Sequence, residues 1–116
     1  PASVITASQD GTAKVWSTET GECLVTLTGH EDEVNSAVTS PDAAVAVTAS
    51  GDRTAKVWGT ESGQCRLTLA GHECDVNSAV FSPDSSWALT ASDDCTAKIW
   101  SMDTGVCLHT LSGHTK

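Results

Sequence analysis

A repeat of 42 residues runs through the whole chain of 116 residues and limits the folds that it can adopt. Tryptophan recurs at this spacing as Trp16, Trp58 and Trp100, and a cysteine and a Gly-His pair recur in the same phase. Residues 30–71 align with residues 72–113 without a gap, and 24 of the 42 positions are identical. A repeat of this length indicates an array of similar supersecondary units, each of which buries its apolar face on a neighbour.

Within each repeat the apolar residues alternate with a period of two, which predicts short β-strands. In the last repeat we expect four strands, at residues 76–81, 87–92, 96–100 and 107–111. Pro, Asp and Gly separate these runs, and no segment of ten residues has a helical stripe. The sequence therefore predicts an all-β fold with four antiparallel strands per repeat, which is typical of a propeller blade.

The charge balance of the chain excludes several classes of partner. Six Lys and Arg residues stand against fifteen Asp and Glu residues, for a formal net charge of −9. So few cations cannot form a basic patch for nucleic acid or for an anionic membrane surface, and we expect neither partner. The longest apolar run, residues 43–47, is too short for insertion into a membrane. We expect a charged partner of this chain to be basic.

Three motifs recur in register: Gly-His, Ser-Pro-Asp, and Thr-Ala-Ser-x-Asp-x-Thr-Ala-Lys-Val/Ile-Trp. Along the whole chain these motifs resemble those of the WD-repeat β-propeller family. The resemblance implies a propeller fold and a non-catalytic scaffold that displays loops to protein partners. The three tryptophans are followed by Ser17, Gly59 and Ser101, where the family name refers to an aspartate, and this departure leaves the expected fold unchanged.

The resemblance also implies a structural hydrogen-bond network in each blade, made of a tryptophan, a threonine, a histidine and an aspartate. The members in the two complete repeats are His30, Thr48, Asp52, Trp58, His72, Thr90, Asp94 and Trp100. A buried indole N–H needs an acceptor, and a threonine hydroxyl can accept from it while donating to an imidazole. The first repeat offers Thr6, Asp10 and Trp16 without a histidine, whereas His114 stands without the other three.

The length of the chain predicts an incomplete set of blades. Three full repeats would need ten residues more than the chain has, and the absent ones correspond to residues 33–42. We expect an incomplete first blade at residues 1–29 that lacks its innermost strand, full blades at residues 30–71 and 72–113, and the start of another unit at residues 114–116. About eleven strands, or about 2.75 blades, fall short of a closed propeller, so we expect self-association or a longer parent chain.

No residue pattern points to a metal, a cofactor or catalysis. The repeated histidines belong to different blades, and the potential triad residues recur once per blade, which favours a structural role. Five cysteines without a disulfide framework favour a reducing compartment such as the cytoplasm. Cys74 and Cys95 depart from the repeat, and a disulfide or redox pair between them is an open alternative.

The resemblance places candidate partner contacts in the loops beside the Gly-His motifs and in the tight turns. These candidates are Gln9, Glu33, Asn35, Gly51, Asp75, Asn77 and Asp93. Three are acidic and none is basic, which favours a basic or hydrogen-bonding peptide as the partner. Trp87 stands where the preceding repeat has Val45 and is either an exposed anchor for a protein or a contact with a neighbouring blade. A structural subunit of a large assembly and the targeting part of a longer multidomain enzyme are alternative functions.

Overall fold

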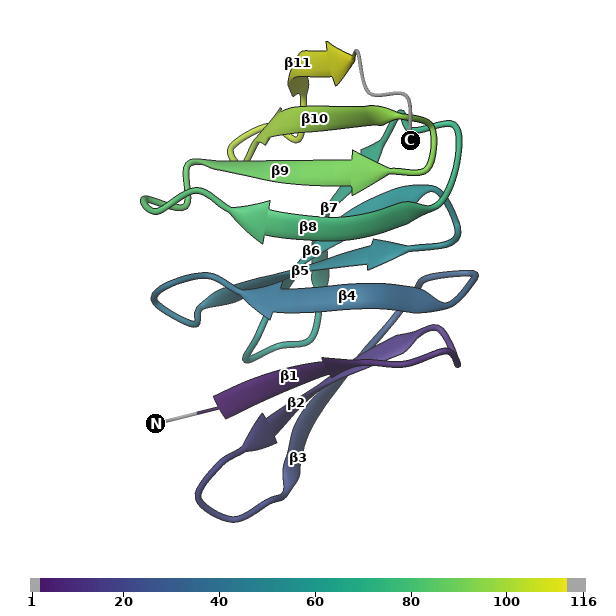
Figure 1. Cartoon of the computed structure of the whole chain (residues 1–116). Coiled ribbons are helices and arrows are strands. Elements are labelled where there is room, and N and C mark those ends of the chain that lie inside the picture. Colours follow the sequence, from purple (N-terminus) through teal and green to yellow (C-terminus); the bar gives the residue numbers. More distant parts are fainter. Residues whose placement is uncertain (1–2, 113–116) are drawn as a thin grey trace.

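The computed structural model describes residues 3–112, and the only regular secondary structure in this range is β-strand (Figure 1). The strands are β1 (Ser3–Ala7), β2 (Thr12–Ser17), β3 (Cys23–Thr28), β4 (Val34–Thr39), β5 (Val45–Ser50), β6 (Thr54–Gly59), β7 (Cys65–Ala70), β8 (Val76–Phe81), β9 (Trp87–Ser92), β10 (Thr96–Ser101) and β11 (Cys107–Ser112). The last four agree with the strands expected from the sequence to within one residue at each end. The predicted all-β fold is confirmed.

The strands form three separate antiparallel sheets. The first sheet contains β1–β3, the second β4–β7 and the third β8–β11, with the strands in chain order across each sheet. By the 42-residue repeat, β1, β2 and β3 correspond to β5, β6 and β7. Within residues 3–112 the first sheet has no counterpart of β4 or β8, as expected for a blade without its innermost strand. The sheets are the blades of an incomplete propeller.

The Ser-Pro-Asp motif forms the turn between the two inner strands of a sheet. In the β4–β5 turn the Ser40 hydroxyl donates to Oδ1 of Asp42 at 2.7 Å, and the Ala44 backbone N–H donates to the same oxygen at 3.0 Å. In the β8–β9 turn the Ser82 hydroxyl donates to Oδ1 of Asp84 at 2.9 Å. Because the short side chains satisfy the turn backbone, the motif fixes the pairing of the strands on either side.

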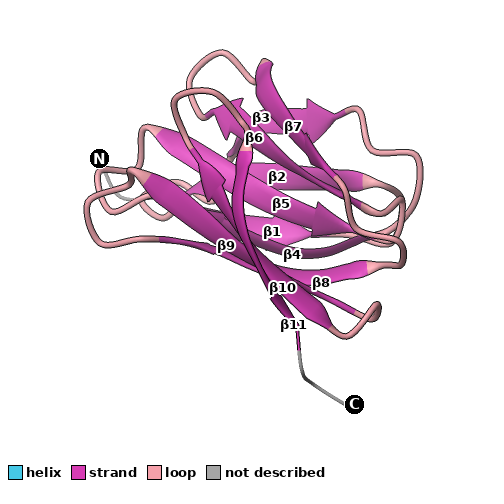
Figure 2. Cartoon of the chain, turned by 90° about the horizontal axis from the view of Figure 1, so that it is seen from above, coloured by secondary structure: helices cyan, strands magenta, loops and turns pink. Residues whose placement is uncertain are grey.

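The sheets stack on one another, and the core lies between them. β1 lies beside β4, and β8 lies beside β4 and β5 (Figures 1 and 2). The cluster between the second and third sheets contains Val47, Ala49, Ala55, Val57, Leu69, Val76, Ala79 and Trp100. A smaller cluster between the first and second sheets contains Ala13, Leu27, Ala46 and Trp58. Burial of apolar surface therefore depends on contact between neighbouring blades rather than on any one blade.

In both Gly-His pairs that the structure describes, the glycine lies against the tryptophan of the sheet that follows it. A Cβ atom on Gly29 would lie 3.2 Å from Cη2 of Trp58, and one on Gly71 would lie 3.3 Å from Cη2 of Trp100. The φ angles of these glycines are 150° and 156°, which other residues rarely adopt. This close approach places His30 beside Trp58, with ring centroids 6.0 Å apart. The motif thus carries the chain from the outer strand of one sheet into the next.

Candidate interaction surface

Four side chains of the second sheet form a continuous line of hydrogen bonds. The indole N–H of Trp58 donates to Oγ1 of Thr48 at 2.9 Å, and this oxygen lies 2.6 Å from Nε2 of His30. The other ring nitrogen, Nδ1, lies 2.8 Å from Oδ2 of Asp52. The same carboxylate oxygen accepts the backbone N–H of Glu31 at 3.1 Å. The line therefore ties the β3–β4 loop to the β5–β6 turn.

The third sheet repeats this arrangement. Trp100 donates to Oγ1 of Thr90 at 2.8 Å, and this oxygen lies 2.7 Å from Nε2 of His72. Nδ1 of His72 lies 2.9 Å from Oδ2 of Asp94, which also accepts the backbone N–H of Glu73 at 3.0 Å. The structure thus brings together all eight residues that the sequence assigned to the two complete networks.

The network of the second sheet favours a neutral imidazole beside an ionised carboxylate. Burial lowers the pKa of His30, and the hydrogen bond and charge of Asp52 offset part of this effect. Burial opposes ionisation of Asp52, but hydrogen bonds from Thr54, His30 and Glu31 outweigh it and lower its pKa to about 2. A neutral imidazole has a single N–H, so Nδ1 donates to Asp52 and Nε2 accepts the Thr48 hydroxyl. Each group then has a partner, as a buried polar network requires.

The first sheet has a tryptophan, a threonine and an aspartate at the network positions, and no described histidine is hydrogen-bonded to them. The indole N–H of Trp16 donates to Oγ1 of Thr6 at 2.9 Å. Oδ1 of Asp10 accepts the hydroxyl of Thr12 at 2.6 Å. His114, which the sequence left without partners, lies outside the described residues. The Trp–Thr hydrogen bond therefore has the same length in the first sheet, where no described histidine bonds to the threonine, as in the second sheet, where one does.

The loops that carry the histidine–aspartate pairs lie at one end of the strands, on the right in Figure 1. We call this end the network end, and it comprises residues 8–11, 29–33, 51–53, 71–75 and 93–95. It carries nine of the fifteen carboxylates of the chain and one guanidinium, that of Arg53. The nine acidic residues are Asp10, Glu31, Asp32, Glu33, Asp52, Glu73, Asp75, Asp93 and Asp94. The network end is therefore strongly negative.

Five of the predicted contact residues line this end. The N–H of Gly51 donates to the carbonyl of Glu33 at 2.9 Å, and the N–H of Asp93 donates to the carbonyl of Asp75 at 3.0 Å. Gln9 and Asp93 are exposed, while the other three are half-buried. These backbone hydrogen bonds hold Gly51 next to Glu33 in the second sheet and Asp93 next to Asp75 in the third.

The two predicted asparagines make different contacts. Nδ2 of Asn35 donates across the blade interface to the carbonyl oxygen of Val76 at 2.9 Å. Nδ2 of Asn77 donates within its own sheet to Oδ1 of Asp93 at 2.6 Å. The amide of Asn35 is thus engaged in a contact between blades, which the sequence reasoning did not foresee.

Trp87 lies apart from the other candidates. It begins β9, opposite Ser101 of β10, whereas Asp93 follows the far end of the same strand. Its side chain shares a face of the third sheet with Ala91, and it is 36% exposed. Among the described residues no strand packs on this face. The structure therefore does not bring Trp87 to the network end.

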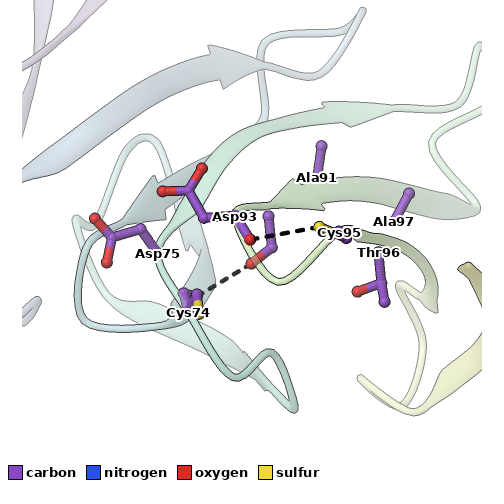
Figure 3. A pocket seen from close by; sticks show the side chains of 8 residues that line it. Cys74, Asp75, Ala91, Asp93, Cys95, Thr96 and Ala97 are labelled. Atoms are coloured by element: carbon purple, nitrogen blue, oxygen red, sulfur yellow. Dashed lines mark hydrogen bonds between the residues drawn. The ribbon is translucent and has the colours of Figure 1, made fainter. Parts of the chain in front are cut away.

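A pocket that the sequence reasoning missed adjoins the network end on the third sheet (Figure 3). It has a volume of about 740 Å³ and is lined by Cys74, Asp75, Ala91, Ser92, Asp93, Cys95, Thr96 and Ala97. Both of its cysteines are free thiols. The signal for it in the sequence was that Cys74 and Cys95 depart from the repeat.

Between residues 3 and 112, no group of three or more His, Cys, Asp or Glu side chains is placed to hold a metal ion. The same range contains no helix that could cross a membrane.

Known proteins match the repeats of this chain. The family model "WD domain, G-beta repeat" matches residues 21–59 and 63–101, which together are more than half of the chain. WD repeat-containing protein 37 of Xenopus tropicalis is 49% identical over 41 residues, which cover 35% of this chain and 8% of that protein. WD repeat-containing protein 86 of Homo sapiens is 44% identical over 41 residues, which cover 35% of this chain and 11% of that protein. The matched segment is thus about a tenth of each relative. The repeat, the sheets that it forms and the two model matches show that the chain belongs to the WD-repeat family.

Proposed function

We propose that this chain is a non-catalytic protein-interaction scaffold that binds a cationic segment of a partner at the network end. Repeats of this family generally mediate protein–protein contacts, and the family is generally non-catalytic. The observation that carries the proposal is the gathering of nine of the fifteen carboxylates, with a single guanidinium, in the loops of this end.

The backbone that carries these carboxylates is held in place before a partner arrives. Asp52 accepts the backbone N–H of Glu31, and Asp94 accepts that of Glu73. The side chains of Glu31 and Glu73 themselves are exposed. A surface with a fixed backbone loses less conformational entropy on binding than a flexible loop does, which favours affinity.

A lysine- or arginine-rich segment fits this surface by charge. Carboxylates form short, charge-assisted hydrogen bonds with guanidinium and ammonium groups. A negative end also attracts cations over a longer range, which speeds the encounter and makes binding sensitive to salt.

Isothermal titration of the full chain with an arginine-rich peptide tests the proposal. The informative variant combines Glu31→Lys and Glu73→Lys at the network end. The matched control combines Glu19→Lys and Glu61→Lys in loops at the other end of the strands, so both variants have the same net charge. We expect the network-end pair to weaken binding roughly tenfold or more and the control pair to weaken it less than about threefold. Equal losses would show that only the overall charge matters and would refute the assignment of the site.

A second candidate function is that of a structural subunit whose neighbours cover the end blades. The specific observation is that Val80 and Leu111, each 46% exposed, lie on the same face of the third sheet as Trp87, which is 36% exposed. These faces also support the expectation that self-association or a longer chain extends the stack. Light scattering on the purified chain tests this, since a monodisperse and cooperatively melting monomer of 12.0 kDa would argue against it.

The free thiols support a reducing compartment such as the cytoplasm as the place where the chain works. All five cysteines are unpaired, and three of them, Cys23, Cys65 and Cys74, are exposed. Free exposed thiols persist where glutathione keeps them reduced. Fractionation of cells that express the tagged chain tests this proposal, and recovery from the secretory pathway would contradict it.

A further inference from the structure

A pocket of about 430 Å³ lies between the second and third sheets, at the end of the strands opposite the network end. We call it the Arg66 pocket, and it is lined by Val45, Val57, Arg66, Leu67, Ser85, Met102 and Asp103. Because its walls come from two sheets that pack on each other, its form does not depend on a further sheet. Pockets that bind small molecules have volumes of about 300–1,000 Å³, so this one can hold a small ligand.

The repeat provides an equivalent pocket between the first and second sheets for comparison. That pocket has a volume of about 500 Å³ and is lined by Ser3, Val15, Ser17, Leu24, Asp42, Ala43, Thr60 and Glu61. A valine and a carboxylate are common to both places, since Val57 corresponds to Val15 and Asp103 to Glu61. The lining of the equivalent pocket has two carboxylates and no cation, whereas that of the Arg66 pocket has one carboxylate and one guanidinium.

The other differences make the Arg66 pocket more apolar as well as more positive. The replacements in this direction are Val45 for Ser3, Met102 for Thr60 and Arg66 for Leu24. The change from Ala43 to Ser85 goes the other way. The hydroxyl of Thr60 donates to the carbonyl oxygen of Ala43 at 2.7 Å, while Met102 offers a flexible apolar side chain at the same place. The repeat is thus broken at several positions around one pocket.

Gly59 allows the guanidinium of Arg66 to lie over the end of the second sheet. A Cβ atom on Gly59 would lie 3.1 Å from Nη2 of Arg66 and 3.2 Å from Nε. The other two sheets have Ser17 and Ser101 at this position, and each serine Oγ accepts the backbone N–H two residues further on, at 3.1 and 3.2 Å. The second sheet therefore gives up this side-chain acceptor of the turn and has the guanidinium in its place.

The charge of Arg66 is available to a ligand. The ion pairs among residues 3–112 are the two histidine–aspartate pairs of the networks, so Arg66 has no carboxylate partner there. Asp103, the one carboxylate that lines the pocket, is exposed, and water screens its repulsion of an anion. A guanidinium binds a carboxylate through two parallel hydrogen bonds. A ligand that joins a carboxylate to an apolar body therefore complements both parts of the pocket.

We infer that the Arg66 pocket binds a small organic molecule in which a carboxylate is joined to an aliphatic chain of medium length. The guanidinium of Arg66 donates two hydrogen bonds to the carboxylate. The aliphatic chain lies against the apolar lining residues Val45, Val57, Leu67 and Met102. This site takes an anion at the end opposite the network end, so the inference goes beyond the proposed function and does not rest on it.

Methyl NMR provides a direct test, because Met102 lines the pocket and is the only methionine of the sequence. The full chain is labelled with carbon-13 at the methionine methyl group, and Met102→Leu assigns the signal. The probe is octanoate at pH 7, and its controls are octanol, which has no charge, and octylammonium, which has the opposite charge. We expect octanoate to shift the signal saturably and to bind roughly tenfold more tightly than octanol, with octylammonium the weakest of the three.

Variants test the part played by the guanidinium. Arg66→Leu introduces the residue that the other two sheets have as Leu24 and Leu108, and it should weaken octanoate binding roughly tenfold while leaving octanol binding unchanged. Gly59→Ser should displace the guanidinium and weaken octanoate binding as well. The charge-matched control is Lys14→Leu in the first sheet, which should leave octanoate binding unchanged. Circular dichroism checks that each variant folds, and for one that does not, the contrast between the probes on the unchanged chain decides.

Three results would overturn the inference. One is the absence of a saturable shift of the Met102 signal with octanoate. Another is equal affinity for octanoate and octanol, or an equal loss of octanoate binding in Arg66→Leu and Lys14→Leu, which would refute the role of the guanidinium. The third is a shift caused by a peptide with a C-terminal leucine but not by octanoate, since the occupant would then be the end of a partner protein. All three leave the binding of an arginine-rich peptide at the network end unaffected, so they are distinct from a failure of the proposed function.

Discussion

The second and third sheets carry equivalent side chains on equivalent faces but bury them very differently. Leu69 in β7 is fully buried, whereas Leu111 at the same position of β11 is 46% exposed. Trp58 is buried in the second sheet, while Trp16 of the first sheet is half-buried. The hydrogen bond from each of these tryptophans to its threonine is nevertheless 2.9 Å long. The local geometry is therefore set within one hairpin, and burial is set by the neighbouring sheet.

The largest difference should appear when the two leucines are truncated. Leu69→Ala removes a fully buried side chain from the interface with the third sheet and should cost about 2–5 kcal/mol of unfolding free energy. Leu111→Ala should cost less than about 1 kcal/mol because its side chain already contacts water. Urea unfolding followed by tryptophan fluorescence measures both. Equal costs would mean that the outer face of the third sheet is covered in solution.

The tryptophan hydrogen bonds give the next largest contrast. Trp58→Phe leaves the buried hydroxyl oxygen of Thr48 without its indole donor, which should cost about 1–3 kcal/mol. Trp16→Phe should cost less, since Thr6 is exposed and water can replace the lost donor. Denaturant melts of the two variants give the order. A larger loss from Trp16→Phe would contradict the view that burial decides the value of this bond.

Acid should weaken the second sheet in two steps. Because burial lowers the pKa of His30, the unfolded chain takes up that proton more readily, and stability falls as the pH drops below about 6.5. The lowered pKa of Asp52, about 2 against an ordinary 3.8, adds stability that is present above the ordinary value and is lost as the pH falls from there toward 2.

Urea midpoints at pH 7, 5 and 3 measure these two steps. His30→Gln should flatten the first step, because the glutamine does not titrate. If the drop from pH 7 to pH 5 is the same in His30→Gln as in the unchanged chain, the first step belongs to other groups.

The smallest effect should come from Trp87, which is 36% exposed on the third sheet. Trp87→Phe should change the unfolding free energy by no more than about 0.5 kcal/mol, as is usual for surface positions. The measurement is the same urea titration, with Trp58→Phe as the reference. A loss as large as that of Trp58→Phe would show that another chain or a second copy covers Trp87.

The bounds of the strands could be predicted from the sequence because turn motifs mark where the strands end. The Ser-Pro-Asp turn closes β8 and opens β9, so both strands were predicted with the bounds that the structure shows. The members of the two complete networks could be listed because the resemblance to the WD-repeat family implies them and each of the two complete repeats has one residue of each type. Their distances could not, because these depend on the approach of the Gly-His loop to the next sheet.

The contacts between sheets could not be predicted from the sequence. An alternating strand has two faces, and the pattern alone does not say which face meets a neighbour. For this reason the hydrogen bond from Asn35 to Val76 and the pocket lined by Cys74 and Cys95 were missed. The same uncertainty left two interpretations of Trp87, and the structure places it on the outer face of the third sheet.

The main contacts between sheets run in a line, from β1 to β4 and from β4 and β5 to β8. Such a molecule is thermodynamically a short one-dimensional chain of coupled units, in which each unit is stabilised by those on either side. Opening should then begin at the two end sheets, so that backbone amides of β5 and β6 exchange their hydrogens with solvent most slowly. A further repeat joined to either end would turn an end unit into a middle one. It would thereby slow exchange in strands to which nothing had been added.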